Sequence, residues 1–257
     1  MEQQRPNNPP NHDEPPVAVK DLRKSFGKQK VLDGIELTIK RGSTIAILGR
    51  SGTGKSVFLK LLIGLQKADS GSIRVTGREV TEAGRTELNE IRKKVGFLFQ
   101  QAALYDSLTV EENVGFPISR HSEMSDEERR NRVKELLANV GMEKDLGKMP
   151  ADISGGMKKR VGLARAMALD PEILLFDEPT AGLDPVTGSE IANLIAEQGK
   201  DRQRTSIVVT HDLRAAKLFA ERVVMIHEGR VLVDGTFEDL EKSEDEFVSR
   251  YWREATQ

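Results

Sequence analysis

The stretch "TIAILGRSGTGKSVFLKLLIGL" (44–65) restricts the possible folds more than any other part of this 257-residue chain. A continuous buried-strand pattern (44–48) leads into "GRSGTGKS" (49–56), which fits G-x-x-x-x-G-K-[S/T], and an apolar-periodic helix follows. A glycine-rich turn that only reverses the chain needs neither the lysine nor the flanking strand and helix. The stretch therefore predicts a nucleoside-triphosphate site in an α/β fold.

The residue types in this loop have distinct tasks. Gly49, Gly52 and Gly54 let backbone N–H groups converge on phosphate oxygens without obstruction by Cβ atoms, and the following helix adds the positive end of its dipole. Lys55 supplies a point charge for the outer phosphates, and the Ser56 hydroxyl can coordinate Mg²⁺.

From Val17 onward, short apolar strands alternate with helices. Strands are predicted at 35–39, 44–48, 71–77, 95–99, 172–176 and 205–209, with a hairpin over 222–235. A helix over 125–141 starts with a Ser125–Glu128 capping box and stops at Gly141. This alternation predicts a largely parallel sheet covered on both faces, and the region of about 100–165, which lacks a strong strand, predicts a helical insertion.

Composition excludes several classes of protein. The formal net charge of −2 argues against a general nucleic-acid binder, and the absence of cysteine rules out disulfides and thiolate metal sites. Residues 1–16, rich in Pro, Asn and Gln, predict a disordered tail and lack the pattern of a secretory signal. No apolar run approaches the roughly 20 residues that span a bilayer. These features indicate a cytosolic chain whose membrane contact would be through partners or through its surface.

Polar residues follow three of the predicted core strands. Asp177 and Glu178 follow the apolar residues of "ILLFDEP" (173–179). His211 follows "VVT", and Gln100 follows "VGFLF". An aspartate at the carboxyl end of a core strand beside a phosphate loop can hold Mg²⁺, and the adjacent Glu178 can orient and deprotonate an attacking water. His211 is directed toward the same edge of the sheet. Lone histidines are usually surface or satisfied residues, which is the interpretation for His12, His121 and His227.

Together these residues resemble the nucleotide-binding subunit of an ABC transporter over nearly all of 17–240. The motifs occur in the family's order: P-loop 49–56, Q-loop Gln100, signature "ISGGM" 153–157, Walker B 173–178, D-loop "AGLD" 181–184 and switch His211. The resemblance implies an α/β P-loop NTPase fold with a RecA-like core, an antiparallel β-subdomain and an inserted helical subdomain. A C-terminal extension over 241–257 follows this ABC ATPase domain.

The resemblance also implies ATP and Mg²⁺ as cofactors and assigns the residues around them. Phe26 looks like the aromatic residue that stacks on adenine. Glu178, His211, Gln100 and Lys55 would be catalytic, and Ser56, Gln100 and Asp177 would hold the metal. The nucleotide would also contact Gly49, Arg50, Ser51, Gly52, Thr53, Gly54, Lys55, Ser56 and Val57.

A head-to-tail homodimer is a further implication of the resemblance. In it Ser154, Gly155 and Gly156 of one subunit cap the ATP held by the other, and Gly182 and Asp184 lie at the dimer seam. Glycines at a helix N-terminus do offer unobstructed N–H donors to an anion. That the anion belongs to another subunit is implied by the family alone.

A narrower resemblance concerns cargo. "GTGKSVFLKLLIGL", "FQQAALYDSLTVEENVGFPI" and "SGGMKKRVGLARAMALDPEILLFDEPTAGLDP" are similar to the ATPases of Mce-associated, Mla-type phospholipid transporters, with Met157 where the generic signature has glutamine. The partners implied are an integral-membrane permease, an Mce-domain substrate-binding protein and a small regulatory subunit, at the cytoplasmic face of the inner membrane. Two alternatives stay open: a transporter for amino acids, lipoproteins or peptides, and a soluble ABC protein acting on DNA or ribosomes.

Two minor features have two interpretations each, and a third has one. Leu104, Tyr105 and Leu108 line the groove for the permease or simply pack the helical subdomain. The segment 237–257 forms a helix on its own core or docks on another subunit or a regulatory partner. Lys158 and Lys159 are expected to be solvated side chains without a contact, the usual state of lysines on a helix surface.

Overall fold

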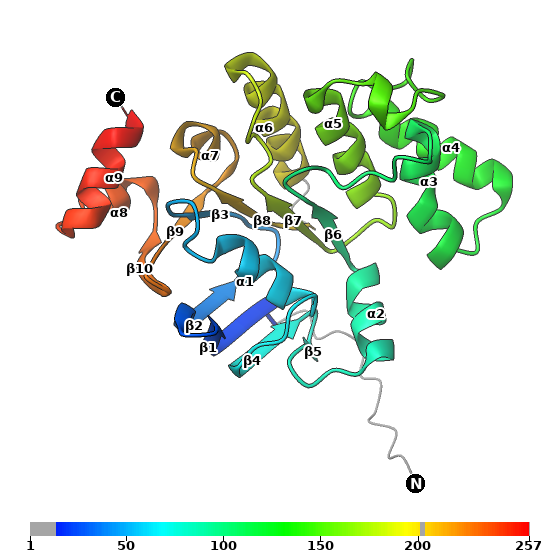
Figure 1. Cartoon of the computed structure of the whole chain (residues 1–257). Helices are drawn as coiled ribbons and strands as arrows, with labels where there is room; N and C mark the ends of the chain where they lie inside the picture. The colour runs from blue at the N-terminus through cyan, green and yellow to red at the C-terminus, as the bar shows by residue number, and fades with distance from the viewer. Residues whose placement is uncertain (1–13, 201–203, 257) are drawn as a thin grey trace, which may run out of the picture.

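The computed structural model describes residues 14–200 and 204–256, and most of the predicted tail 1–16 lies outside them. The central element is a six-stranded sheet in the order β10-β9-β3-β8-β7-β6 (Figure 1). Its strands are β3 (Thr44–Leu48), β6 (Val95–Leu98), β7 (Ile173–Asp177), β8 (Thr205–Thr210), β9 (Arg222–His227) and β10 (Arg230–Gly235). All neighbouring pairs are parallel except the β9–β10 hairpin, so the largely parallel sheet and the hairpin are confirmed.

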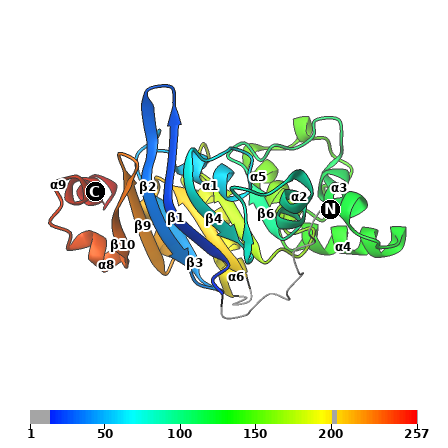
Figure 2. The same ribbon diagram turned by 90° about the horizontal axis from the view of Figure 1, so that it is seen from below.

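A second, antiparallel sheet of four strands has the order β2-β1-β4-β5. Its strands are β1 (Val17–Phe26), β2 (Gln29–Ile39), β4 (Ser70–Val75) and β5 (Arg78–Glu79). Figure 2 shows β1 and β2 lying across the core sheet beside α1. Phe26, at the tip of the β1–β2 hairpin, lines the same cavity as Ser51 and Gly52 of the loop 49–56.

The helices cover both faces of the core sheet. They are α1 (Lys55–Leu62), α2 (Arg85–Lys93), α3 (Val110–His121), α4 (Asp126–Ala138), α5 (Gly155–Ala166), α6 (Pro185–Lys200), α7 (Leu213–Phe219), α8 (Phe237–Glu241) and α9 (Glu246–Thr256), with a 3₁₀ turn at Pro150–Asp152. Between β6 and β7 lie α3, α4, the 3₁₀ turn and α5 without an intervening strand. No helix within the described ranges is both long and apolar enough to cross a bilayer.

The alternation of side chains along β3 explains the two-sided core. Ala46 and Leu48 join the apolar cluster formed with α3–α9, whereas Ile45 and Ile47 join the cluster formed with α1, α2 and the antiparallel sheet. All five residues of β3 are buried. A strand buried on both faces is read as a continuous apolar run, which is why the sequence pattern located it.

Helix ends agree with the predicted signals. Ser125 and Glu128 form the capping box of α4, which stabilises its N-terminus by satisfying two orphan N–H groups. Gly141 follows the helix with φ +69°. At the C-terminus, α9 buries Val248 and Tyr251 against its own core, as the first interpretation of 237–257 predicts.

Candidate nucleotide site

A cavity of about 410 Å³ lies at the carboxyl ends of the core strands, where ligands bind in open α/β sheets. The antiparallel sheet contributes Phe26, which is 47% exposed and could stack on a planar ring. The Lys24 amine lies 5.2 Å from the centre of its ring. Ten of the predicted residues line this single cavity: Phe26, Ser51, Gly52, Gly54, Lys55, Ser56, Val57, Gln100, Glu178 and His211. Gln29 and Val31 of β2 also line it, and sequence reasoning missed both.

The turn of the P-loop requires glycine at two positions. A Cβ on Gly49 would lie 2.5 Å from the carbonyl oxygen of Ile226, and this backbone atom of β9 could not move away without distorting the strand. Gly54 has φ +93°, and a Cβ there would lie 2.6 Å from a methyl group of Val31. The loop is therefore packed closely against β9 and β2, and its residues Ser51, Gly52 and Gly54 line the cavity.

Lys55 is held inside this loop. Its amine donates hydrogen bonds to the carbonyl oxygens of Gly49 (2.8 Å) and Arg50 (3.0 Å) and lies 3.5 Å from Oε1 of Glu178. Burial lowers the pKa of Lys55, and the neighbouring Glu178 carboxylate opposes that shift. The result is a cation fixed at the point where the outer phosphates of a nucleotide would bind.

Two oxygen ligands suited to Mg²⁺, from Ser56 and Asp177, lie next to each other beside the loop. The Ser56 hydroxyl donates a 2.6 Å hydrogen bond to Asp177 Oδ1, and Asp177, the last residue of β7, is 4% exposed. Burial raises the pKa of Asp177, against the effect of the Ser56 hydrogen bond. Within the described part of the chain, no cluster of three or more His, Cys, Asp or Glu could hold a metal alone. These residues fit Mg²⁺ that takes its remaining ligands from phosphates and water.

Glu178 is held in an unusual conformation. Its φ is +47°, in the left-handed region that non-glycine residues seldom adopt, and its N–H donates to the carbonyl oxygen of Val209 (2.9 Å). Its Oε2 lies 2.8 Å from Nδ1 of His211. This carboxylate, between an amine and an imidazole at the cavity wall, can accept a proton from a bound water.

Four predicted residues form a second group away from this cavity. Ser154 is the N-cap of α5, and its hydroxyl accepts from the N–H of Met157 (3.3 Å). Asp184 accepts from the N–H groups of Val186 and Thr187 at the start of α6, and the Thr187 hydroxyl lowers the pKa of Asp184. Gly155 and Gly156 complete the group at the start of α5.

Gly156 also has a packing role inside the subunit. A Cβ at this position would lie 2.4 Å from Cγ2 of Thr187 on α6. The open helix start that suits an anion therefore also allows α5 and α6 to approach closely. Met157, which is partly buried, packs against the apolar cluster on this side of the sheet.

The prediction that Lys159 is solvated is wrong. Its side chain is 4% exposed, and its amine donates to the carbonyl oxygens of Gln100 and Glu178, the second at 3.0 Å. Burial lowers the pKa of Lys159 to about 8, although Asp177 and Glu178 oppose the shift. The helical spacing of buried Gly156, Lys159 and Leu163 placed this lysine on the inner face of α5 and could have revealed it.

The C-terminal helix also reaches the site. Glu254 forms a 2.9 Å ion pair with Arg50 of the P-loop, whose guanidinium lies 5.8 Å from the ring centre of Phe247. The Tyr251 hydroxyl donates a 2.8 Å hydrogen bond to the carbonyl oxygen of His211. The Arg50 side chain is thus bound to α9, and this contact had no signal in the sequence.

Replacing Tyr251 by phenylalanine tests this contact. Loss of the hydroxyl leaves the His211 carbonyl without that donor, so we expect the free energy of unfolding to fall by about 1 kcal/mol. Urea denaturation measures the change. Tyr105→Phe is the matched control, because Tyr105 is 46% exposed and its hydroxyl has no hydrogen-bond partner among the described residues. Equal losses in the two variants would contradict a specific role for the Tyr251 hydroxyl.

Comparison with known sequences identifies the family. The family model described as "ABC transporter" matches residues 32–181. The probable ribonucleotide transport ATP-binding protein mkl of Mycobacterium tuberculosis is 41% identical over 235 residues, covering 91% of this chain and 66% of that protein. The methionine import ATP-binding protein MetN of Rhizobium johnstonii is 41% identical over 219 residues, covering 85% of this chain and 60% of that protein. The chain thus spans slightly less than two thirds of these relatives.

Solved structures agree with the fold. The ATP-binding cassette MJ0796, in a dimeric post-hydrolysis state with ADP and Pi, has a TM-score of 0.79 and 35% identity, covering 86% of this chain and 98% of that one. The cassette cbiO1 from Clostridium perfringens, part of the ABC transporter complex cbiONQ, has a TM-score of 0.80 and 31% identity, covering 94% and 96%. Since the family model matches more than half of the chain, this protein belongs to the ABC transporter family, and its fold is that of an ABC ATP-binding cassette.

Proposed function

We propose that this chain is the ATP-hydrolysing subunit of a bacterial ABC transporter that moves phospholipid with an Mce-type envelope system. The observation that carries ATP hydrolysis is the single cavity in which Lys55, Gln100, Glu178 and His211 converge. ATP binding closes a dimer of two such chains and hydrolysis reopens it. These motions drive a membrane permease, in the same way that contacts to a γ-phosphate drive conformational changes in other nucleotide-dependent proteins.

Each cavity residue has a role that its geometry supports. Lys55 neutralises the outer phosphates, and Glu178 takes the proton of the attacking water. His211 bonds Oε2 of Glu178 and orients that carboxylate. Ser56, Gln100 and Asp177 would hold Mg²⁺, which offsets the charge of the phosphate oxygens when it is bound.

The residues of the second group support a head-to-tail dimer. Ser154, Gly155, Gly156 and Asp184 do not line the cavity of their own chain, so they are available to cap a nucleotide held by another subunit. Helix N-termini bind anions through free N–H groups and the helix dipole. The dimeric state of the MJ0796 cassette is consistent with this arrangement.

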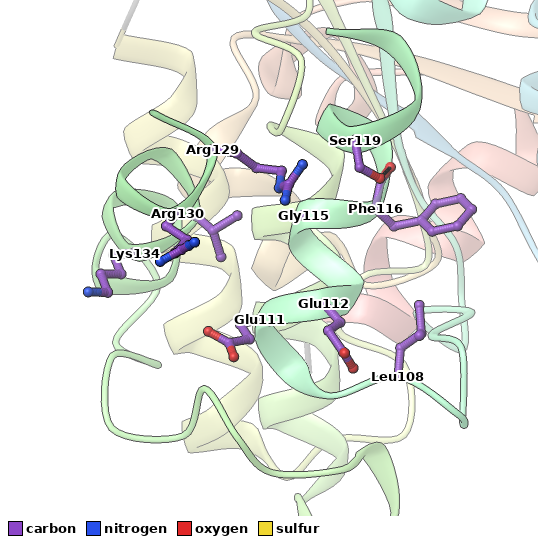
Figure 3. Close-up of a pocket in the computed structure, with 10 residues that line it drawn as sticks. Leu108, Glu111, Glu112, Gly115, Phe116, Ser119, Arg129, Arg130 and Lys134 are labelled. Atoms are coloured by element: carbon purple, nitrogen blue, oxygen red, sulfur yellow. Dashed lines mark hydrogen bonds between the residues drawn. The ribbon is translucent and has the colours of Figure 1, made fainter. Parts of the chain in front are cut away.

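A groove between α3 and α4 supports the docking of a permease. Figure 3 shows Glu111 of α3 on the side of a groove whose other wall, α4, is basic through Arg129, Arg130 and Lys134. Glu112 lies on the Leu108 side of α3, where its carboxylate accepts from the N–H of Thr109. Of the three residues considered for this groove, Leu108 lines it, Leu104 packs against the core, and Tyr105 contacts the Phe116 ring at 4.8 Å. Permease binding here would place the chain peripherally at the cytoplasmic face of the inner membrane.

The lipid cargo rests on the resemblance of three segments, including the signature with Met157, to the Mla-type ATPases. A second candidate is a transporter for another cargo, and the similarity to a methionine import protein favours it. The protein would be purified from detergent-solubilised membranes and its partners identified. A multi-span permease with an Mce-domain protein supports lipid transport, whereas a soluble periplasmic solute-binding protein contradicts it.

A further inference from the structure

Helix α5 connects the two groups of functional residues. Its first turn carries Ser154, Gly155 and Gly156, which belong to the group outside the cavity. One turn later, Lys159 turns inward and reaches the residues that follow β6 and β7. The same helix therefore carries the residues proposed to cap a partner's nucleotide and the lysine that contacts the cavity segments of its own subunit.

Lys159 joins the ends of two neighbouring strands. Leu98 of β6 pairs with Phe176 of β7, and each strand is followed by a cavity residue, Gln100 and Glu178. The amine of Lys159 bonds the backbone carbonyls of both. A buried amine with carbonyl partners fixes the separation of these two backbones, because water has no access to replace a broken bond.

The segment around Gln100 is also packed tightly on α5. A Cβ on Gly162 would lie 2.7 Å from Cδ1 of Leu98 and 3.1 Å from Cβ of Ala102. Arg165 donates to the carbonyls of Ala102 (2.6 Å) and Ala103 (2.8 Å), and both alanines have positive φ. This segment and α5 are thus positioned to move together.

We propose that Lys159 is a positioning residue that couples α5, which begins within the signature 153–157, to the segments carrying Gln100 and Glu178 in its own subunit. A shift of the α5 N-terminus on a partner's nucleotide would reach both loops through this amine. The proposal rests on the roles given to Gln100 and Glu178 above. Loss of turnover in Glu178→Gln tests those roles separately from the role of Lys159.

Lys159→Met is the informative variant, because methionine keeps the length and packing of the side chain and removes its donors. We expect kcat for ATP hydrolysis to fall about tenfold, the size of one charge-assisted hydrogen bond. KM should stay within about twofold, because Lys159 does not line the nucleotide cavity. Lys158→Met is the control: the adjacent lysine is half-buried and has no hydrogen bond or ion pair within the described residues. Its kcat should match that of the wild type.

Two further variants separate positioning from general stability. Lys159→Arg restores charged donors and should recover most of kcat. In a Gln100→Ala background, Lys159→Met should lower kcat by a smaller factor if Lys159 acts through Gln100. If Lys159 has a purely structural role, the two factors by which kcat falls in the single variants multiply in the double variant. If the methionine variant does not fold, Lys159→Gln replaces it, because the shorter amide cannot reach both carbonyls. An unchanged kcat, a change confined to KM, or full multiplication in the double variant would overturn the proposal.

Discussion

Glu178→Gln is expected to lower kcat for ATP hydrolysis by about 10²- to 10⁴-fold, the usual contribution of a positioned general base. Glutamine keeps the size of the side chain and its reach toward Lys55 and His211, but it cannot take a proton from water. ATP binding should therefore persist. Phosphate release measures turnover, and titration with a fluorescent ATP analogue measures affinity.

The same variant should also accumulate as a dimer with MgATP, because closure proceeds and reopening through hydrolysis does not. Size-exclusion chromatography with and without nucleotide measures this shift. Glu190→Gln is the control, since Glu190 is an exposed carboxylate on α6 paired with Arg160. Unchanged turnover in Glu178→Gln would refute the role of Glu178 as the base.

Lys55→Met is expected to weaken MgATP binding by about 10- to 150-fold, which corresponds to the roughly 1.5–3 kcal/mol of hydrogen bonding to a charged group. Among the described residues, Lys55 has the only side-chain amine within 4 Å of the Glu178 carboxylate. The substitution therefore also removes the positive charge next to Glu178. Calorimetric titration with MgATP measures the loss. Lys67→Met, at an exposed lysine after α1, should leave affinity unchanged. Wild-type affinity in Lys55→Met would contradict the assigned phosphate contact.

Much of the cavity was predictable because its parts are either local or delivered by strands. The P-loop residues lie within eight positions of one another, so their spacing alone defines the turn. Gln100, Glu178 and His211 follow core strands, and the carboxyl ends of parallel strands meet at one edge of a sheet. The buried runs of β3, β7 and β8 likewise reflect burial on both faces.

What could not be predicted depends on tertiary packing. The sequence predicts Lys159 to be a surface lysine, because its burial depends on the packing of α5 against the segments that follow β6 and β7. The ion pair between Arg50 and Glu254 joins residues 204 positions apart, and no local pattern encodes it. The two-residue strand β5 is too short to show a period of two.

The sheet order has a consequence for the synthesis of this protein. Among the strands of residues 14–200 and 204–256, β3, which leads into the P-loop, pairs only with β8 and β9. Its partner residue Ile207 follows Ile45 by about 160 residues. At the roughly 5–20 residues per second of translation, β3 waits about 8 to 30 s for a neighbour. The antiparallel sheet, complete by Glu79, can fold on the ribosome during that delay. The candidate nucleotide site, in contrast, is complete only after Glu178 and His211 have been synthesised, late in translation.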